Sequence, residues 1–445
     1  MSRSDAGNRA LLTVFPLTAK VDARGRLRIG GCDTVELAAR FGTPLYLFDE
    51  ATLRRKCSEF REEFGRRYPD TRVIYASKAF LNPALVAMLA SENLGLDVVS
   101  GGELAVAQSV QFPAERIYFH GNNKSRAELE QALAYSVGRV VVDNFHELEL
   151  LNEAARRAGK TQDILLRLNP GVDPHTHAHI ATGVADSKFG FPLAGGQAEE
   201  AMRQAASAPG LKLVGLHCHI GSQVFEVEPF LEATELVLRF AAGMCPPQAG
   251  FELMEFSPGG GFAVQYLVET PAPPVSRYAE AITSRVLALC GALGLAPPRL
   301  VLEPGRGIVG QAGVALYTLG SVKDIPGVRR YVCVDGGMGD NIRPALYEAG
   351  YEALLANKAD QPGTERVTLA GRFCESGDIL VKDVMLPPVK AGDIVAVPVS
   401  GAYAPAMASN YNAVPRPAMV MVQDGKARLI RRRESYEDLM LRDSV

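Results

Sequence analysis

The feature of this sequence that most restricts its fold is an eightfold alternation of apolar runs with helical stretches between about residues 45 and 304. Each run is short and rich in β-branched residues, as expected of a buried strand, and a polar or glycine-containing turn follows it. Segments 83–92, 126–136, 147–158 and 278–293 repeat apolar residues three and four positions apart and are predicted to be amphipathic helices. The eight runs are Arg72–Tyr75, Gly95–Val99, Arg116–His120, Gly138–Val142, Asp163–Leu168, Leu211–His217, Phe251–Phe256 and Arg299–Glu303.

Strands that alternate with helices are predicted to lie parallel, because parallel neighbours need a crossover connection and a helix supplies it. Closing the sheet removes its exposed edges, so we expect an α/β fold, a (β/α)8 TIM-type barrel, over residues 45–304. An open doubly wound sheet is the alternative. The barrel is favoured because residues suited to chemistry follow nearly every run, as they do where the loops after all strands meet at one mouth.

After Arg306 the pattern changes to short apolar alternations broken by Gly, Pro and Asp, which are typical of β structure. They are VALYTLGSV, RYVCVDGG, GDIVAVPVS and AMVMVQDGKARLI. The first 44 residues contain LTAKVDARGRLRIGG, which predicts a hairpin that turns at Asp22–Gly25. We therefore expect residues 1–44 and 305–445 to form a second, mainly β domain.

Composition excludes several classes of protein. Of the 445 residues, 47% are hydrophobic and 22% are charged, and the net charge is −3, so neither disorder nor nucleic-acid binding is expected. The sequence has no apolar stretch of the length that a membrane helix needs, and its start lacks the apolar core of a secretion signal. We expect a cytoplasmic protein that does not bind membranes.

Disulfide and metal chemistry are not expected either. The seven cysteines are odd in number, dispersed and without CxxC spacing. His175, His177 and His179 lie close together in PHTHAHIA, but no acidic or cysteine ligand has a matching spacing. The sequence therefore predicts no metal site.

Lys78, in YASKAF, follows the first predicted strand, so its amine is expected to point into the barrel mouth. Apolar surroundings lower the pKa of a lysine, and a neutral amine can form a Schiff base with an aldehyde cofactor. The simpler interpretation is a lysine that pairs with a loop carboxylate.

Two glycine-rich turns follow the last two predicted strands. They are SPGGGF, with Gly259, Gly260 and Gly261, and EPGRG, with Gly305 and Gly307. Glycine lets backbone N–H groups approach an anion closely, and barrels commonly bind phosphate after strands seven and eight. Either turn alone could be an ordinary tight turn, but their shared position predicts a phosphate site.

Glu303 ends the eighth run and is expected at the same mouth, where a carboxylate beside a pyridine nitrogen would favour the protonated ring. A salt bridge to Arg306 is the simpler interpretation. In GLHCHIGSQ, after the sixth run, His219 could stack on a cofactor ring, and Gly221 with Ser222 could add phosphate donors. A lone histidine is more often structural.

In the β domain, CESGD contains Cys374, Glu375 and Asp378. A thiol can deliver a proton to a carbanion, and a carboxylate can hold an ammonium group. Arginine binds carboxylates through two parallel hydrogen bonds. The residues suited to binding a carboxylate are Arg306, Arg343, Tyr347 and Tyr403, each of which, taken alone, would be a surface or packing residue.

Taken together, these motifs resemble one family. YASKAF, GLDVVSGGEL, LRLNPGVDPHTH, ATGVADSKFGF, GLHCHIGSQ, PGGGF, EPGR, NIRPALY, CESGD, GAY and SNYN follow one another between about Thr43 and Val422. They resemble the fold-type III, alanine racemase-like decarboxylases that use pyridoxal 5′-phosphate (PLP), and within these the diaminopimelate decarboxylase family.

The resemblance implies that PLP is the cofactor and that Lys78 binds it covalently. It also implies that His219 stacks on the pyridine ring and that Glu303 contacts the pyridine nitrogen. The phosphate contacts that it implies are Ser222, Gly259, Gly260, Gly261, the EPGR turn with Gly305 and Arg306, and Tyr403. The substrate contacts that it implies are Arg306, Arg343, Tyr347, Glu375 and Tyr403.

The resemblance further implies a head-to-tail homodimer in which the CESGD loop of one subunit completes the site of the other, so that Cys374 acts in trans. The implied reaction removes the D-centre carboxylate of meso-2,6-diaminopimelate as carbon dioxide. Cys374 or a water molecule then delivers the proton that gives L-lysine.

Two segments depart from the family's usual pattern beside the predicted site. Ala404 and Pro405 follow GAY, where a glycine and then a bulky Phe or Met are typical. Arg372 and Phe373 precede CESGD, where a proline and a small residue are common. These departures bear on the substrate rather than on the cofactor.

Three other functions stay open at this stage. A racemase of the same fold usually has an arginine facing the pyridine nitrogen, whereas this chain has Glu303. Decarboxylases for D-ornithine, D-lysine or a carrier-bound amino acid resemble the same family. A non-catalytic PLP-binding regulatory homologue is disfavoured by the presence of Cys374 and Glu375.

Overall fold

The computed structural model describes residues 10–68, 70–173, 187–245 and 251–444. The chain forms two compact units. We call them the barrel unit (Cys57–Ala263 and Pro273–Gly305) and the β unit (Met1–Lys56, Val264–Ala272 and Arg306–Val445). The segment with His175, His177 and His179 lies outside the described residues. Within these ranges, no helix combines the length and the apolar character needed to span a membrane.

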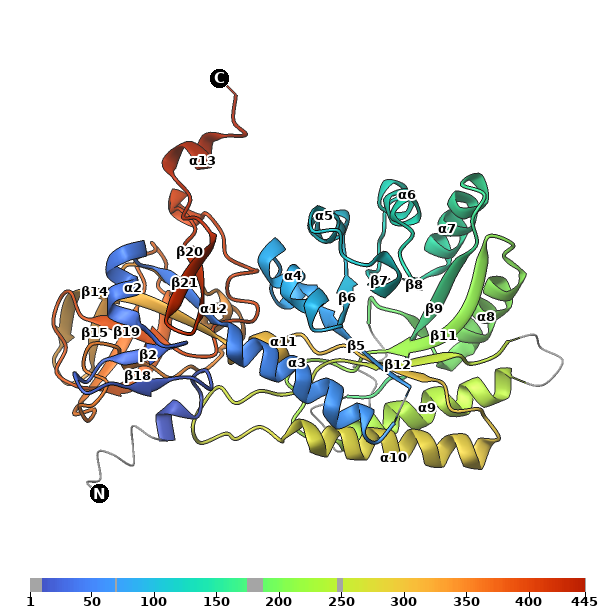
Figure 1. Cartoon of the computed structure of the whole chain (residues 1–445), viewed down its shortest axis with the longest axis horizontal. Coiled ribbons are helices and arrows are strands. Elements are labelled where there is room, and N and C mark those ends of the chain that lie inside the picture. Colours follow the sequence, from blue (N-terminus) through green and yellow to red (C-terminus); the bar gives the residue numbers. More distant parts are fainter. Residues whose placement is uncertain (1–9, 69, 174–186, 246–250, 445) are drawn as a thin grey trace. The chain divides into compact units, whose positions relative to one another are not determined.

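The barrel unit contains the eight parallel strands that the sequence predicts, closed into a TIM-type barrel (Figure 1). Each strand pairs with the next, β8 pairs with β9, and β13 pairs back with β5. The predicted barrel is confirmed, and the open sheet is wrong. The strands are β5 (Thr71–Ala76), β6 (Gly95–Val98), β7 (Ile117–Phe119), β8 (Arg139–Val142), β9 (Gln162–Asn169), β11 (Leu211–Cys218), β12 (Glu255–Gly259) and β13 (Arg299–Leu302), and the short β10 (Phe191–Pro192) pairs with β9.

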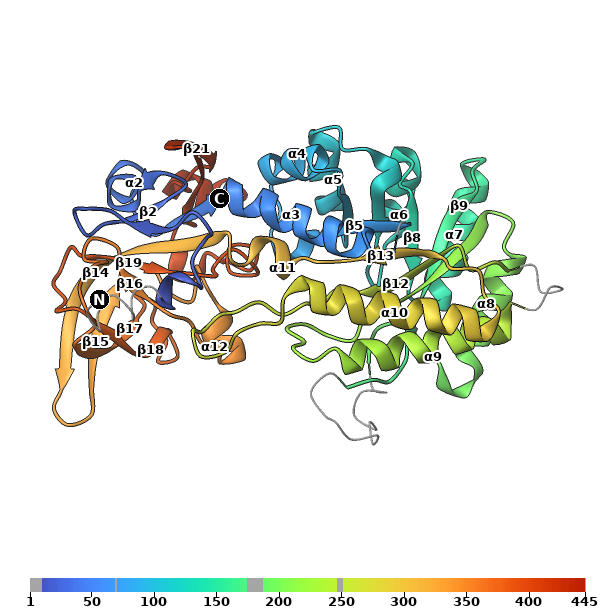
Figure 2. The ribbon, with the colours of Figure 1, turned by 60° about the horizontal axis from the view of Figure 1, so that its bottom comes forward.

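Helices connect successive strands and cover the outside of the barrel, and the two longest, α9 and α10, lie side by side (Figures 1 and 2). The helices are α3 (Glu50–Gly65), which begins in the β unit, α4 (Pro83–Ser91), α5 (Gly101–Ser109), α6 (Arg126–Tyr135), α7 (Phe145–Arg157), α8 (Gln197–Ser207), α9 (Glu228–Met244) and α10 (Val275–Leu293), with 3-10 turns η1 (Ser77–Ala79), η2 (Ala114–Arg116) and η3 (Ala194–Gly196).

Four of the turns that lead from a strand into a helix end in a capping residue. The side chains of Asn82, Ser100, Ser125 and Asn144 each accept a hydrogen bond from a backbone N–H in the first turn of the next helix. Such caps satisfy amide groups that the helix itself leaves unpaired. They set where each helix begins, and so they keep the loops at the barrel mouth short.

Buried side chains from several barrel strands pack together. They form one core cluster of Ile74, Tyr118, Val141, Leu165, Val214 and Val301. Towards the amino ends of the strands, buried Glu255 accepts hydrogen bonds from Tyr118 at 2.9 Å, from Arg139 at 2.7 Å and from Arg299 at 3.3 Å. This ionic group closes the end of the barrel opposite the mouth.

Replacing Glu255 by alanine is expected to destabilise the barrel unit by roughly 3 kcal/mol, because Arg139 and Arg299 lose the buried carboxylate that they share. Chemical unfolding followed by circular dichroism measures this as a lower denaturant midpoint. Glu115→Ala, at a side chain that is 72% exposed, is the control. Equal midpoints for the two variants would contradict the prediction.

The β unit is built on a nine-stranded sheet and a three-stranded sheet, and β14 and β15 form a long hairpin (Figure 2). The predicted hairpin at Asp22–Gly25 is present, with the Asp22 N–H donating to the Arg26 carbonyl. The elements are β1 (Lys20–Val21), β2 (Leu27–Ile29), β3 (Cys32–Asp33), α2 (Thr34–Phe41), β4 (Leu45–Asp49), α11 (Arg306–Val309), β14 (Gly313–Ile325), β15 (Arg329–Val334), α12 (Arg343–Tyr347), β16 (Leu354–Leu355), β17 (Glu365–Ala370), β18 (Ile379–Leu386), β19 (Ile394–Val397), the 3-10 turn η4 (Tyr411–Ala413), β20 (Ala418–Gln423), β21 (Lys426–Arg431) and α13 (Tyr436–Met440).

The division between the units differs from the boundaries expected from the sequence. Strand β4 pairs with β14 and β20, so Leu45–Asp49 lies in the β unit although residues 45–304 were assigned to the barrel. Val264–Ala272 also leaves the barrel and belongs to the β unit. Both segments are governed by pairing and packing with residues far away in the sequence.

Candidate active site

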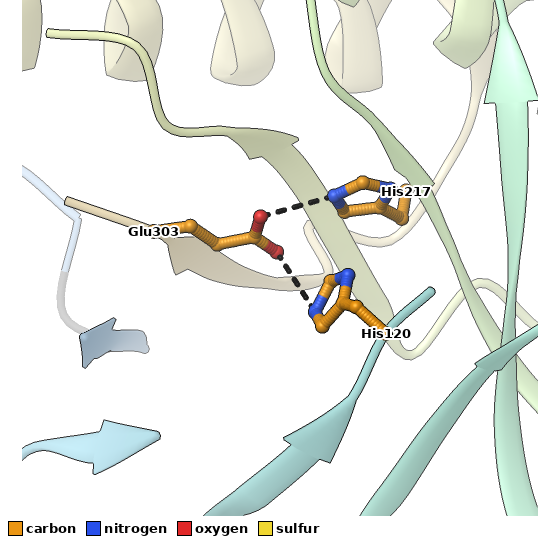
Figure 3. Close-up of side chains that lie close together, drawn as sticks. All are labelled: His120, His217 and Glu303. Carbon is orange, nitrogen blue, oxygen red and sulfur yellow. Dashed lines mark hydrogen bonds and ion pairs between the residues drawn. The ribbon is translucent and has the colours of Figure 1, made fainter. Parts of the chain in front are cut away.

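Polar side chains converge where the barrel strands end. His120 follows β7, His217 lies near the end of β11, and Glu303 follows β13; Figure 3 shows the two imidazoles turned towards the carboxylate. All three are buried. They come from three strands that are adjacent neither in sequence nor in the sheet, and the barrel closure brings them to one mouth.

The Glu303 carboxylate is held on both oxygens. Its Oε2 lies 3.1 Å from His217 Nε2, Ser257 donates its hydroxyl to Oε1 at 2.8 Å, and His120 Nε2 lies 3.7 Å from Oε1. Burial by itself raises the pKa of this carboxyl, but His217, His120 and the Ser257 hydroxyl outweigh it and hold the pKa below its usual range. Glu303 is therefore ionised at neutral pH.

The neighbouring buried groups are neutral. Burial lowers the pKa of His120 well below its usual value, so this imidazole is uncharged. Burial also raises the pKa of Asp97 to about 8, although the charge of Lys78 opposes the shift. Of the buried carboxyls Asp97 and Glu303, only Glu303 carries its charge throughout the neutral range.

Lys78 lies in η1, directly after β5, and is exposed rather than surrounded by apolar groups. Its positive charge opposes the rise in the pKa of Asp97. Burial is the main cause that lowers the pKa of His219, and the charge of Lys78 is the second. Lys78 is therefore on the same side of the barrel as these groups, within reach of the mouth.

His219 is half-buried and fixed through one ring nitrogen. Its Nδ1 accepts a hydrogen bond from the Gly260 N–H at 3.3 Å. Burial lowers its pKa well below the usual value, so the ring is neutral with its proton on Nε2. A neutral imidazole held in this way can lie against an aromatic ring.

The first glycine-rich turn packs so closely that no side chain fits. A Cβ on Gly260 would lie 2.1 Å from the Glu303 carbonyl oxygen, and one on Gly261, whose φ is +102°, would lie 2.4 Å from the Gly221 carbonyl oxygen. In the second turn, a Cβ on Gly305 would lie 3.0 Å from Ala76 Cβ. The turns after β11, β12 and β13 therefore place their backbone groups in one close-packed cradle, beside which Ser222 is exposed.

In the β unit, the structure brings three of the predicted substrate and cofactor residues together. Arg306 and Arg343 are buried, and the Arg306 guanidinium lies 4.7 Å from the centre of the Tyr403 ring. Tyr403 has a φ of +64°, a left-handed conformation that is rare for a bulky residue and typical of functional sites. Tyr347, by contrast, is 60% exposed.

The CESGD loop exposes Cys374 and Glu375. The Cys374 N–H donates to Asn412 at 3.0 Å, and Tyr411 donates its hydroxyl to Glu375 at 2.7 Å. Asp378 is instead buried and accepts from backbone N–H groups of the β unit, one of them at 2.6 Å. Asp378 therefore shapes the loop, while the thiol and the Glu375 carboxylate face outward.

The residues that depart from the family pattern have structural partners. Ala404 is fully buried, and Phe373 stacks on Tyr411 with their ring centres 6.1 Å apart. A larger side chain at position 404 would have to displace its neighbours. Pro405 and Arg372 have no such explanation in the described contacts.

Several functional-looking residues were not predicted. His120 and His217 each end one of the predicted apolar runs, which was the available signal, but nothing in their spacing relates them to Glu303. Ser257 precedes the first glycine turn, and in the sequence it is indistinguishable from an ordinary turn residue. The three groups in Figure 3 also present metal-ligand atoms within 4.8 Å of one another, a set that sequence spacing could not reveal.

These residues fit pyridoxal phosphate. The barrel mouth has a primary amine on Lys78, an ionised buried carboxylate on Glu303, a neutral imidazole on His219, and glycine turns that have no side chains to keep an anion from the backbone. These are the groups that the aldehyde, the ring nitrogen, the ring face and the phosphate of the cofactor require.

Known proteins resemble this chain over nearly its whole length. The model for the pyridoxal binding domain of pyridoxal-dependent decarboxylases matches residues 50–310. Diaminopimelate decarboxylase from Bacillus subtilis (strain 168) is 46% identical over 96% of this chain and 97% of the relative, and that from Actinosynnema pretiosum subsp. auranticum is 47% identical over 98% and 97%. A crystal structure of diaminopimelate decarboxylase from M. jannaschii in complex with L-lysine has a TM-score of 0.90, with 37% identity over 96% of this chain and 98% of that one. The chain belongs to the diaminopimelate decarboxylase family of pyridoxal-dependent decarboxylases.

Proposed function

We propose that this protein decarboxylates meso-2,6-diaminopimelate at its D-centre and so produces L-lysine and carbon dioxide, with pyridoxal 5′-phosphate as cofactor. The observation that carries the proposal is the ionised, doubly held carboxylate of Glu303 at the barrel mouth, on the same face as Lys78. Similarity to diaminopimelate decarboxylases over 96% of the chain, one of them a structure with bound L-lysine, supports the substrate.

In this proposal, several residues hold the cofactor. Lys78 binds it through the ε-amine, His219 lies against the ring, and Glu303 faces the ring nitrogen. When bound, pyridoxal phosphate supplies a conjugated ring that takes up the electron pair left at the α-carbon as carbon dioxide departs. The phosphate is assigned to Ser222, Gly260, Gly261, Gly305, Arg306 and Tyr403.

Glu303 favours decarboxylation over racemisation. A negative charge beside the ring nitrogen keeps that nitrogen protonated, which makes the ring a strong electron acceptor. A racemase has to restrain this electron uptake, and a neutral or cationic partner does so. Glu303 is ionised because His217 and Ser257 hydrogen-bond to it.

The far end of the substrate carries a carboxylate and an ammonium group. We assign its carboxylate to Arg306 and Arg343, with Tyr347 beside them, and its ammonium to Glu375. Arginine suits the carboxylate because its planar donors match both oxygens. Ornithine and lysine lack one of these two far-end charges, which distinguishes them from diaminopimelate.

The protein is proposed to be a head-to-tail homodimer in the cytoplasm, in which Cys374 of one subunit delivers a proton to the α-carbon of substrate bound to the other. Cys374 and Glu375 are exposed in the isolated chain, as this role requires. Leu346 and Tyr347 of α12 are also exposed, at 54% and 60%, and would be covered by a partner subunit.

One assay tests the proposed function. Purified protein with pyridoxal phosphate is offered meso-diaminopimelate and the D- and L-forms of ornithine, lysine and arginine in parallel, and released carbon dioxide is measured. We expect release from meso-diaminopimelate alone or far above the others. A preference for D-ornithine or D-lysine would mean that this amino acid, and not meso-diaminopimelate, is the substrate. Release of carbon dioxide from none of them would favour a non-catalytic PLP-binding protein.

Mixing two inactive variants tests the shared site. Cys374→Ala and Lys78→Ala homodimers are each expected to be impaired, but a mixed dimer has one site with both native residues. After subunit exchange, about a quarter of all sites are native, so about a quarter of the activity should return. Cys374→Ala alone should still bind the cofactor with an unchanged absorption spectrum. If the mixture shows no more activity than the variants measured apart, Cys374 does not act in trans.

A further inference from the structure

Two arginines and three tyrosines of the β unit form a buried group that we call the tyrosine–arginine cluster: Tyr266, Arg306, Arg343, Tyr351 and Tyr403. The Arg306 guanidinium lies 4.7 Å from the Tyr403 ring centre and 5.6 Å from that of Tyr266. The Arg343 guanidinium lies 4.7 Å from the Tyr266 ring centre and 5.7 Å from that of Tyr351. Tyr266 therefore contacts both cations.

Each guanidinium is also held by a hydrogen bond to a phenol. Arg306 Nη1 donates to the Tyr266 hydroxyl at 2.5 Å, and Arg343 Nη1 donates to the Tyr351 hydroxyl at 2.6 Å. The rings of Tyr266 and Tyr351 meet edge to face with their centres 5.3 Å apart. The two phenols thus connect the two arginines into one rigid arrangement.

The phenol of Tyr351 holds Arg343 without cancelling its charge. Burial raises the pKa of Tyr351, so its hydroxyl stays neutral. Arg343 has no acidic partner among the residues that the structure describes, although it is only 7% exposed. Arg139 in the barrel shows the ordinary alternative, since it is paired with the carboxylates of Glu255 and Asp163. A buried cation held only by neutral partners is arranged to receive an anion.

We propose that Tyr266 and Tyr351 are positioning residues that determine specificity for substrates with a second carboxylate. They fix the spacing and orientation of Arg306 and Arg343 through their hydrogen-bonded phenols, and Tyr351 leaves the other guanidinium N–H groups of Arg343 available to the carboxylate. This proposal rests on the function proposed above, because it takes these arginines as the substrate's far-end contacts.

Phenylalanine variants test the role of the two hydroxyls. Tyr266→Phe and Tyr351→Phe keep the rings but remove the acceptor for each guanidinium. We expect KM for meso-diaminopimelate to rise about tenfold in each variant, with kcat changed less than about threefold, because the lost contact is to the non-reacting end. The absorption spectrum of the bound cofactor should not change.

A pair of ligands separates positioning from general damage. L-lysine and cadaverine differ only by the carboxylate, and each is measured as an inhibitor of the holoenzyme. The inhibition constant of L-lysine should rise about as much as KM, while that of cadaverine should stay the same. Tyr46→Phe is the matched control, because this buried tyrosine of the same unit donates to the Asp340 carbonyl at 2.6 Å and to neither arginine.

The outcomes are distinct. Suppose that the native enzyme turns over meso-diaminopimelate, but KM and the inhibition constant of L-lysine are unchanged in both phenylalanine variants. This result would overturn the role of the tyrosines and leave the proposed function standing. Equal losses for L-lysine and cadaverine, or an equal loss in Tyr46→Phe, would reduce the tyrosines to structural residues. A native enzyme that neither turns over meso-diaminopimelate nor binds L-lysine would overturn the proposed function itself.

Discussion

Lys78→Ala is expected to lower kcat for meso-diaminopimelate by at least about a thousandfold, because the variant lacks the amine that binds the cofactor covalently and is displaced by the substrate. The measurement is carbon dioxide release from protein saturated with pyridoxal phosphate. The visible absorption band of the native protein, which borohydride should abolish by reducing the bond to Lys78, should be absent or shifted in the variant.

Two further variants distinguish a role of the Lys78 amine as a nucleophile from a role of its positive charge. The charge of Lys78 opposes the burial that raises the pKa of Asp97 and adds to the burial that lowers the pKa of His219, so the alternative is a purely electrostatic role. Lys78→Arg keeps a cation but no Schiff-base-forming amine, and should be as inactive as Lys78→Ala. Lys212→Ala, at an exposed lysine on β11, should behave as the native protein. Substantial activity in Lys78→Arg would make Lys78 an electrostatic residue.

Most of the barrel could be predicted because parallel strands buried on both faces form continuous apolar runs with few alternatives. The largest error is β12, expected at Phe251–Phe256 and found at Glu255–Gly259. Ser257, Pro258 and Gly259 have turn propensity, but pairing with β11 and β13 holds them in the sheet. Tertiary pairing overrides local propensity here.

The domain boundary could not be predicted for a related reason. LYLFD at Leu45–Asp49 has the composition of a barrel strand and precedes a helix, as a barrel strand does. Its partners β14 and β20 lie more than 250 residues further along the chain. Periodicity identifies a strand, but it does not say with which strand it pairs.

The candidate site also contains residues that could be predicted from the sequence and residues that could not. Lys78, Glu303 and the glycine turns could be proposed from their place after a strand, since barrel geometry puts such residues at one mouth. The partners of these residues could not: His217 and Ser257 around Glu303, and Tyr266 and Tyr351 around the arginines, depend on contacts between distant elements. A sequence motif shows which groups are present, and only the fold shows what holds them.

Glu303→Gln provides the strongest test of the electrostatics. Glutamine has nearly the shape of glutamate and can still accept a hydrogen bond from Ser257, but it cannot carry the negative charge that His217 and Ser257 stabilise in the native protein. Without that charge, position 303 would no longer favour a protonated ring nitrogen in the bound cofactor, and the ring would be a weaker electron acceptor. We expect kcat to fall about 100- to 1,000-fold while the cofactor stays bound.

The control for this experiment is Glu103→Gln. Glu103 lies in the first turn of α5, after β6, and the charge of Lys78 partly offsets the rise in its pKa that burial causes. Its carboxylate accepts a hydrogen bond from the Val99 N–H, and no contact with Glu303 occurs among the described residues. Its variant should keep near-native kcat.

The pKa of Glu303 lies below its usual range, so the native enzyme should show no loss of activity from protonation of this group as the pH falls through the ordinary glutamate range. Near-native kcat in Glu303→Gln would mean that the charge at the barrel mouth does not drive the departure of carbon dioxide.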